Sequence, residues 1–324
     1  MPPAQGSGDP IADLQQGLEI RRTADGSFSL WSEQFGEGFH SGRGAVREAR
    51  ETFVAPAELL RFSTGSTLRV VDLCVGTGSN TAALLEACSD QGLQLQWWGL
   101  ELDPATLRLA LAEPSFQSQW QSEALDPLCQ LDHQGIWNSQ LGQGHMLWGD
   151  ARQTVKAVLE QARGTVDLVL HDAFSPRHCP QLWTVDFLAQ LGALLAPKGR
   201  LITYCSAAAV RQGLRLAGLE LAAIPAQSLL HQGSGSSPPR RAWSGGTVAS
   251  PSPLEPSPWL RPLEPMELEH LGTSAAEPYR DPTGQAGATE IVEARSQSQA
   301  ERLASGEVEA SSAWRRRWGL ERPA

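Results

Sequence analysis

The sequence predicts an open α/β fold in which helices cover both faces of a doubly wound, mostly parallel sheet. Three observations support this. Apolar strand-like segments alternate with helical segments from residue 68 to 218, as in βαβ units. The first of these strands ends in a Gly-x-Gly turn at Gly76 and Gly78. Acidic residues follow several successive strands, which is typical of a ligand site at one edge of a sheet.

The periodicity assigns the elements of this core in order. Continuous apolar runs predict strands over residues 68–74, 93–100, 145–148, 166–171 and 200–205. Helical spacing lies between and after them, over residues 79–88, 104–112, 151–162, 182–195 and 207–217. Residues 219–224 and 246–249 are expected to form a terminal antiparallel pair. The crossovers between parallel strands should be right-handed.

The flanking segments predict a three-part chain. Residues 1–18 are expected to be flexible, and the domain should cover residues 19–250. It should open with a hairpin extension over 18–30, turning at Asp25-Gly26, and a helix over 45–60. The Gln-rich stretch 116–143 should be helical cover, and residues 233–239 a flexible loop. Residues 251–324 are rich in Pro, Glu and Ser and predict a mostly disordered tail, with a helix near 297–318.

Composition limits the class of protein. The chain has 324 residues, 41% of them hydrophobic, so it can bury a sizeable core. No apolar run is long enough to span a membrane and the first residues lack a signal-peptide pattern, so we expect a cytoplasmic protein. The five cysteines are not spaced as metal ligands and have apolar neighbours, so we expect buried, reduced thiols and no metal site. The net charge of −10 gives no general attraction for DNA or RNA, and an RNA partner would need a local basic patch.

The turn after the first core strand favours one nucleotide cofactor over another. A dinucleotide fingerprint requires a third glycine, and Thr81 stands at that position. Asp72, just before the loop, instead suits the positive amino group of S-adenosylmethionine. The loop residues expected to contact this cofactor are Gly76, Thr77, Gly78 and Asn80.

Carboxylates at successive strand ends extend this hypothesis. Glu101 could accept hydrogen bonds from both ribose hydroxyls, and Asp150, followed by Ala151, from the adenine amine. Each acid alone is often a helix cap or a solvated loop residue. In series after a Gly-x-Gly turn, Asp72, Glu101, Asp150 and Asp172 predict one pocket and an S-adenosylmethionine-dependent methyltransferase.

The segment after the fourth strand carries the expected chemistry. Methyl transfer requires a nucleophile with a free lone pair, held in line with the methyl group. Asp172 could accept a proton from an amine and aim its lone pair, unless it is only a structural acceptor in its loop. Phe174 could form a wall facing the cationic methyl group, and Pro176 fixes the loop.

These residues also carry a family resemblance. The sequence resembles the MnmC family of tRNA wobble-uridine modification enzymes, in its methyltransferase domain and the stand-alone MnmD form, over roughly residues 20–250. The motifs are Thr23-Ala24-Asp25-Gly26-Ser27, Ser32-Glu33-Gln34-Phe35-Gly36-Glu37, Gly44-Ala45-Val46-Arg47-Glu48, Gly76-Thr77-Gly78-Ser79-Asn80, Asp172-Ala173-Phe174-Ser175-Pro176 and Pro180-Gln181-Leu182-Trp183-Thr184.

The resemblance implies a class I, Rossmann-like methyltransferase fold. It implies transfer of a methyl group to the 5-aminomethyl group of (2-thio)uridine at the tRNA wobble position, with tRNA as partner. It places Asp172 on the substrate side with Glu48, Pro176 and Arg177, and Glu33 with the cofactor contacts. After residue 251 no second dinucleotide loop appears, so we expect no fused oxidase activity.

Two features bear on tRNA binding. The basic stretch typical of the family is replaced by a Gly/Ser/Pro-rich segment over 233–246. A patch could instead come from Arg43, Arg47, Arg177, His178, Arg211 and Arg215, or these could be solvated surface cations. Residues 314–318 interleave tryptophan and arginine, as an RNA-binding tail or as a solvated disordered tail.

Three alternatives remain open from the sequence. The first is a methyltransferase of the same fold that acts on a small molecule. The second is a non-enzymatic member that binds a ligand or a protein. The third is a nicotinamide-dependent oxidoreductase, which Thr81 disfavours.

Overall fold

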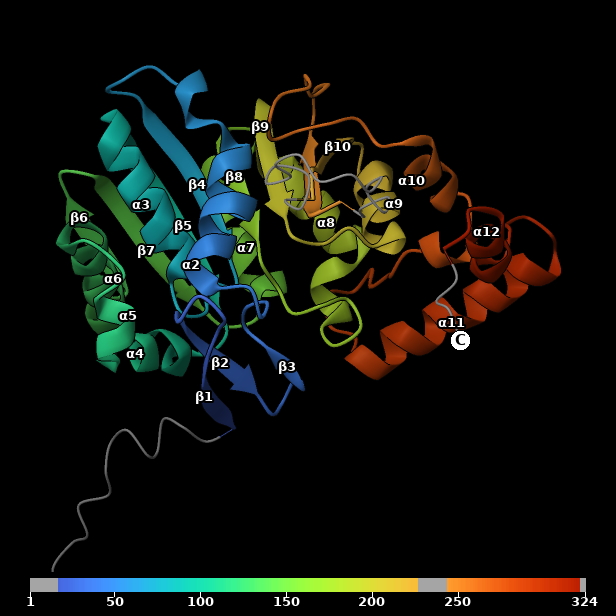
Figure 1. The fold of residues 1–324 in the computed structure, drawn as a ribbon, viewed down its shortest axis with the longest axis horizontal. Helices are drawn as coiled ribbons and strands as arrows, with labels where there is room; N and C mark the ends of the chain where they lie inside the picture. The colour runs from blue at the N-terminus through green and yellow to red at the C-terminus, as the bar shows by residue number, and fades with distance from the viewer. Residues whose placement is uncertain (1–16, 227–243, 321–324) are drawn as a thin grey trace, which may run out of the picture.

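The computed structural model describes residues 17–226 and 244–320, and its main feature is an eight-stranded sheet (Figure 1). The strand order is β10-β11-β9-β8-β4-β5-β7-β6. The four pairings among the central five strands are parallel, and β6, β10 and β11 pair antiparallel at the two ends. The strands are β4 (Thr67–Leu73), β5 (Gln94–Glu101), β6 (Ile136–Ser139), β7 (Gly142–Trp148), β8 (Val166–His171), β9 (Leu195–Thr203), β10 (Glu220–Ile224) and β11 (Gly246–Ser250).

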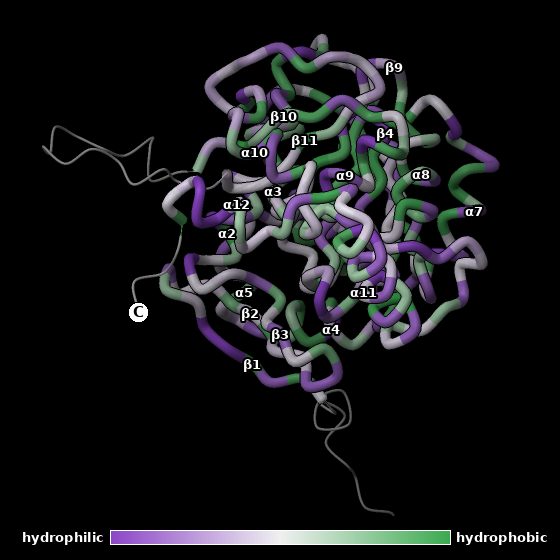
Figure 2. The backbone as a smooth tube through the Cα atoms, turned by 90° about the vertical axis from the view of Figure 1, so that its right-hand side faces the viewer, coloured by the Kyte–Doolittle hydropathy of each residue, from purple (hydrophilic) through white to green (hydrophobic). Residues whose placement is uncertain are grey.

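Helices cover the sheet on both faces. Successive residues of β4 point to opposite sides, so Val70 packs into one cluster and Val71 into the other. The first cluster includes α3 (Ser79–Gln91), α4 (Pro104–Ala112) and α6 (Ser122–Gln134). The second includes α7 (Ala151–Ala162), α8 (Val185–Leu194) and α9 (Ala208–Leu216). The tube view shows the hydrophobic residues concentrated along the inner strands, whereas β1 is hydrophilic (Figure 2).

The N-terminal segment forms a small sheet at one end of the molecule (Figure 1). Its strands are β1 (Leu18–Arg22), β2 (Phe28–Ser32) and β3 (Glu37–Gly38), and β1 and β2 form the expected hairpin. Asp25 Oδ1 accepts hydrogen bonds from the amide of Ser27 (3.0 Å) and the hydroxyl of Thr23 (2.6 Å), which fixes the turn. The expected flexible lead-in lies almost wholly outside the described residues.

Two segments differ from the predicted elements. The expected helix over 45–60 is broken into α2 (Ala45–Glu48), η1 (Ala49–Val54), η2 (Ala55–Ala57) and η3 (Leu59–Arg61), with Glu58 in the left-handed region at φ 50°. The Gln-rich stretch is helical through α5 (Pro114–Gln117) and α6, but it ends in strand β6. Trp137 in β6 packs over Gly144, where an added Cβ would lie 1.9 Å from the indole nitrogen. This close contact favours a strand over continued helix.

The C-terminal segment is the main correction. Residues 251–320 form α10 (Pro265–His270), η6 (Ser274–Ala276), α11 (Ala288–Ala304) and α12 (Ser311–Arg317), and Figure 1 shows them beside α8 and α9. The expectation of a mostly disordered tail is therefore wrong for these residues, because remote contacts hold them. Trp314, the first aromatic of the tryptophan–arginine stretch, is 1% exposed and stacks on His270 at 4.1 Å. The helix expected near 297–318 is observed as parts of α11 and α12.

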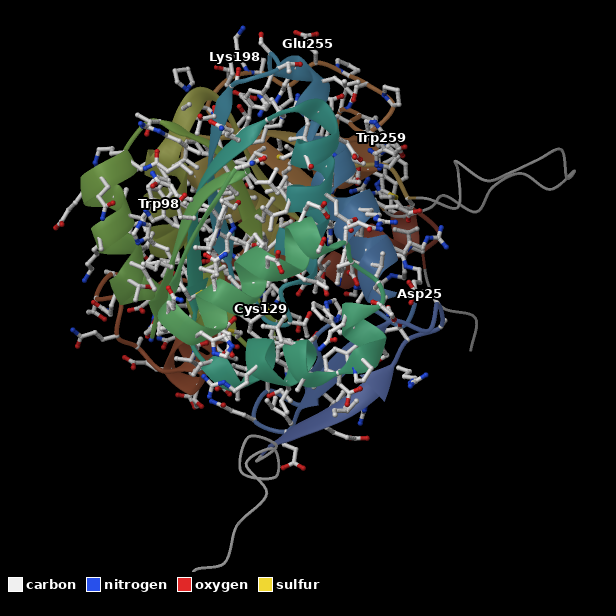
Figure 3. The ribbon with its side chains drawn as sticks, turned by 90° about the vertical axis from the view of Figure 1, so that its left-hand side faces the viewer. Asp25, Trp98, Cys129, Lys198, Glu255 and Trp259 are labelled. Atoms are coloured by element: carbon white, nitrogen blue, oxygen red, sulfur yellow. The ribbon has the colours of Figure 1, made fainter. Side chains whose placement is uncertain are left out.

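Three further expectations concerned the cysteines, membrane-spanning helices and the loop over 233–239. Cys88, Cys179 and Cys205 are buried and all five cysteines are free, but Cys129 on α6 is exposed, as Figure 3 shows. No helix in the described part of the chain is long and apolar enough to cross a membrane. The flexible loop expected over 233–239 lies outside the described residues.

Candidate functional site

A cavity of about 510 Å³ opens at the carboxyl ends of the central strands. It lies where the chain order reverses, with β5 on one side of β4 and β8 on the other, which is the ligand-binding position of open α/β sheets. The residues after β2 form its other wall. Its size is within the roughly 300–1,000 Å³ range of small-ligand sites.

The loop after β4 has an unusual backbone. Cys74, Gly76 and Gly78 all have positive φ, at 62°, 56° and 82°, although Cys74 is not a glycine. An added Cβ at Gly76 would lie 3.1 Å from the ring of Phe39, which borders the cavity. At Gly78 it would lie 3.0 Å from Leu107 instead, so Gly78 permits helix packing. Of the loop residues expected at the cofactor, Gly76 lines the cavity, whereas Thr77, Gly78 and Asn80 stand behind it.

Asp72 is not where the sequence hypothesis placed it. Its side chain is fully buried and lies outside the cavity lining, because strand alternation puts it on the same side of β4 as Val70, toward α3. Its Oδ2 accepts a 2.6 Å hydrogen bond from the hydroxyl of Thr81. Burial raises the pKa of Asp72 to about 7. The expected direct contact with a cofactor amino group is therefore corrected to a structural role beneath the loop, in which Thr81 is its partner.

Glu101 lies at the end of β5 and lines the cavity, with 8% exposure. Its carboxylate accepts from the amides of Gly76 (2.8 Å), Leu102 (2.7 Å) and Asp103 (3.0 Å). Burial raises its pKa although these amides act in the opposite direction. A carboxylate has about four acceptor positions, so roughly one remains for a ligand hydroxyl rather than the two ribose contacts expected.

Asp150 and Ala151 line the cavity after β7. Asp150 caps α7 by accepting from the amide of Arg152 (2.9 Å), and its side chain is 40% exposed. Arg152 also lines the cavity and pairs with the Asp150 carboxylate at 2.7 Å. The acid is thus present at the predicted strand end, but with a cation that the sequence did not reveal.

Asp172 follows β8 and faces the same cavity. The side-chain amide of Asn80 donates to its Oδ2 at 2.8 Å. Burial, together with the nearby charge of Glu48, raises the pKa of Asp172 well above its ordinary range. Glu48 also lines the cavity, where its Oε2 accepts from the amide of Ser41 at 2.8 Å. The structure therefore brings the two acids expected on the substrate side to one wall.

Aromatic rings border Asp172. Phe174 stacks on Phe35 with ring centroids 4.5 Å apart and meets Phe39 edge-on at 5.0 Å. The carbonyl of Phe174 accepts from the indole of Trp183 at 2.8 Å, and Tyr204 donates to the carbonyl of Ala173 at 2.9 Å. These bonds fix the loop after β8 and the direction of its side chains.

Several lining residues come from the N-terminal segment and were not singled out from the sequence as site residues. Glu37 accepts from the amide of Ser175 at 2.9 Å, which ties this segment to the loop after β8. His40 is held between Ser29 (3.1 Å) and Thr77 (3.5 Å), and burial lowers its pKa to about 4. Two sequence signals mark this segment, the motif from Ser32 to Glu37 that carries the family resemblance and the short hydrophobic strand, but neither predicts its contact with the sheet edge.

Other expected site residues lie away from the cavity. Glu33 and Arg177 are exposed, and Pro176 is buried, and none of the three lines it. The suggested basic patch loses one member, because Arg211 is 1% exposed and pairs with Glu267 at 3.0 Å. Arg240 and Arg241, the arginines of the Gly/Ser/Pro-rich segment over 233–246, lie outside the described residues.

The charge of the lining distinguishes between ligand classes. Among the described residues that line the cavity, one guanidinium, that of Arg152, stands against six carboxylates, namely Glu37, Glu48, Glu101, Asp103, Asp150 and Asp172. Such a cavity favours a cation over the phosphates of a dinucleotide. A sulfonium with an ammonium group and a nucleoside fits this set of acceptors, and the bare backbone at Gly76 allows close approach.

The comparisons agree with this geometry. Residues 137–228 match a family of S-adenosyl-L-methionine-dependent methyltransferases. A tRNA 5-methylaminomethyl-2-thiouridine biosynthesis bifunctional protein MnmC from Pseudomonas aeruginosa is 31% identical over 76% of this chain and 37% of its own length. An uncharacterized protein of Methanocaldococcus jannaschii is 30% identical over 63% of this chain and 55% of its own.

The same relationship holds in three dimensions. The crystal structure of MnmC2 from Aquifex aeolicus superposes with a TM-score of 0.69 and 28% identity, covering 88% of this chain and 85% of that one. The chain spans little more than a third of the Pseudomonas MnmC protein. The predicted class I methyltransferase fold, the cofactor class and the resemblance are thus confirmed. The chain is an S-adenosyl-L-methionine-dependent methyltransferase, similar in sequence and fold to the MnmC proteins.

Proposed function

We propose that this methyltransferase methylates the 5-aminomethyl group of (2-thio)uridine at the tRNA wobble position. The observation that carries the proposal is the wall formed by Asp172, Glu48 and Phe174, which offers a cationic amine two carboxylates and an aromatic face. The relatives named for 5-methylaminomethyl-2-thiouridine biosynthesis support the same substrate. A tRNA substrate would place the reaction in the cytoplasm.

The residues would divide between the two ligands. Glu101, Asp150, Ala151 and the backbone at Gly76 are proposed to hold the cofactor. S-adenosylmethionine, when bound, supplies an electrophilic methyl group on a positively charged sulfur.

Asp172 would bind the substrate amine and take its proton. An alkylamine has a pKa near ~10, so at neutral pH it arrives mostly as ammonium. A carboxyl whose pKa is raised by burial and by Glu48 is a stronger base than an ordinary aspartate. The pKa of Asp172 is therefore closer to that of the substrate ammonium. Asn80 fixes the Oδ2 atom, so the amine lone pair can be aimed at the methyl carbon while Oδ1 receives the proton. The amine nitrogen would gain the methyl group and lose one proton to Asp172, and the electron pair of the broken bond would leave with S-adenosylhomocysteine.

A second candidate is methylation of a small-molecule amine. The net charge of −10 and the burial of Arg211 favour it, because both reduce the attraction for a polyanion.

One experiment separates these functions. The protein is incubated with radiolabelled S-adenosylmethionine and either tRNA containing 5-aminomethyl-2-thiouridine, the same tRNA lacking the aminomethyl group, or the free nucleoside. We expect label only in the first tRNA, in a nucleoside that mass spectrometry identifies as 5-methylaminomethyl-2-thiouridine. Equal labelling of the free nucleoside would favour the small-molecule function, and labelling of the unmodified tRNA would refute the proposed target.

A matched pair of variants tests the residue. Asp172→Asn should lose transfer and keep cofactor binding, whereas Asp132→Asn, which removes an acid on α6 outside the cavity, should behave as wild type.

A further inference from the structure

One arginine connects the cofactor side of the cavity to the C-terminal segment. Arg152 donates to both oxygens of Asp150, through Nε at 3.1 Å to each and through Nη2 at 2.7 Å to Oδ2. Its Nη1 donates to Oδ2 of Asp281 at 2.8 Å and to the carbonyl of Ala286 at 2.9 Å. Its guanidinium is therefore held from two sides, by a cavity residue and by a segment 129 residues further along the chain.

Asp281 is built as a rigid anchor. It is 3% exposed, and its Oδ1 accepts from the amides of Gly284 (3.0 Å) and Ala286 (3.3 Å) and the hydroxyl of Thr283 (2.8 Å). Burial raises the pKa of Asp281, but its bonds from Thr283, Ala286 and Arg152 outweigh this, so the pKa is lowered and the group stays charged. Its own amide donates to Asp186 on α8 at 2.7 Å.

We propose that Asp281 is a positioning residue for the cofactor, because it holds Arg152 against Asp150 and thereby sets the carboxylate that faces the nucleoside. The Asp150 side chain is 40% exposed, and beyond the cap bond that Oδ1 accepts from the backbone amide of Arg152, the guanidinium is what holds its Oδ2 in place. A second carboxylate also leaves the three-residue group with a net charge of −1, so Asp150 keeps acceptor strength that a simple one-to-one pair would neutralise. The inference rests on the proposed role of Asp150 in cofactor binding.

Asp281→Asn is the direct test. The amide oxygen of asparagine can keep the loop bonds on Oδ1, while its NH₂ group would face the guanidinium of Arg152 and repel it. We expect the Kd for S-adenosylhomocysteine, measured by calorimetry on the full chain, to rise about tenfold, the loss of roughly one charge-assisted bond. The KM for S-adenosylmethionine should rise with it, whereas kcat and the KM for the methyl acceptor should not change. Arg152→Lys, which cannot reach both acids, should give the same split if Asp281→Asn folds poorly.

Glu277→Gln is the matched control. Within the C-terminal segment, Glu277 joins the stretch just before Asp281 to α11, through Arg302 (2.6 Å) and Ser298 (2.7 Å). It does not line the cavity. The Glu277→Gln variant should have a lower melting temperature, and its Kd for S-adenosylhomocysteine should stay within about twofold of wild type. If Asp281→Asn and Glu277→Gln weakened S-adenosylhomocysteine binding equally, Asp281 would only hold the C-terminal segment in place, and the inference would be overturned.

The role of Asp150 is tested separately. If Asp150→Ala weakens binding and Asp281→Asn does not, the inference fails while the cofactor assignment stands. If Asp150→Ala binds as wild type, the assignment of Asp150 fails and the inference with it. If both weaken binding, Asp281→Asn should have no further effect in the Asp150→Ala background, and an additive loss would also overturn the inference.

Discussion

Replacing Glu267 with glutamine should destabilise the whole domain, because this residue balances a buried cation. Glu267 on α10 accepts from Arg211 (3.0 Å) and Arg261 (2.5 Å) and from the amide of Glu264 (2.9 Å). Arg211 on α9 is itself 1% exposed. Glu267→Gln removes the charge but leaves the guanidinium in place.

The magnitude follows from that burial. Removing one partner of a buried ion pair costs about 3–5 kcal/mol. An unfolding entropy of about 2.1 cal/mol/K per residue, over the 287 described residues, converts this into a fall in Tm of about 5–8 °C. Although burial alone raises the pKa of Glu267, Arg261 and Arg211 hold it at about 2. Because this pKa is depressed, the stabilisation is complete above the ordinary value of 4.5 and is lost as the pH falls toward 2.

The assay is thermal unfolding of wild type, Glu267→Gln and Glu269→Gln at pH 7 and at low pH. Glu269 lies on the same helix but pairs with Arg317 at the surface, so its variant should change Tm little. The difference between wild type and Glu267→Gln should shrink as the pH falls below 4.5. An unchanged Tm at pH 7 would refute the reasoning and show that α10 is not anchored by this pair.

Three further predictions concern the cavity and the loop beneath it. Asp172→Asn should lower methyl transfer by about 10²–10⁴-fold with unchanged S-adenosylhomocysteine affinity. It should also raise the Tm of the ligand-free protein more at pH 8 than at pH 5, because the raised pKa of Asp172 means that its charged form destabilises the fold. Gly76→Ala, at φ 56° and 3.1 Å from Phe39, should cost about 1–2 kcal/mol in denaturant unfolding and weaken cofactor binding in calorimetry. Since the pKa of Asp72 is raised from 3.8 to about 7, its contribution to stability is complete below 3.8 and is lost as the pH rises to about 7. Asp72→Asn should therefore remove that part of the Tm–pH curve while binding S-adenosylhomocysteine as wild type; weakened binding would restore Asp72 to the site.

The parts of the fold that local periodicity specifies could be predicted from the sequence. β8 was expected over residues 166–171 and is observed as Val166–His171, because a buried parallel strand is a continuous apolar run. Asp150 and Asp172 could be placed for the same reason, since parallel strands end at one edge of the sheet. The place of Asp72 at a strand end was not enough, because it does not reveal which face of the sheet the side chain takes. The structure puts Asp72 on the same face as Val70, away from the cavity.

The remainder depends on contacts between distant residues. The composition of 251–320 is typical of disorder, yet three of its residues are buried, namely Glu267 against Arg211, Asp281 against Arg152 and Trp314 against His270. Arg152 illustrates this limit for the site. In sequence it is an ordinary helical arginine, and only the structure shows that Asp150 and Asp281 hold its guanidinium from two sides.

A crystal structure of the complex with S-adenosylhomocysteine tests the central claim most directly. The account predicts the nucleoside between Glu101 and Asp150, with a ribose hydroxyl within hydrogen-bond distance of Glu101 and the sulfur facing Asp172 beside Phe174. Density for the ligand in another cavity, beside β6 and β7, which Trp98, His133 and His145 line, would contradict it.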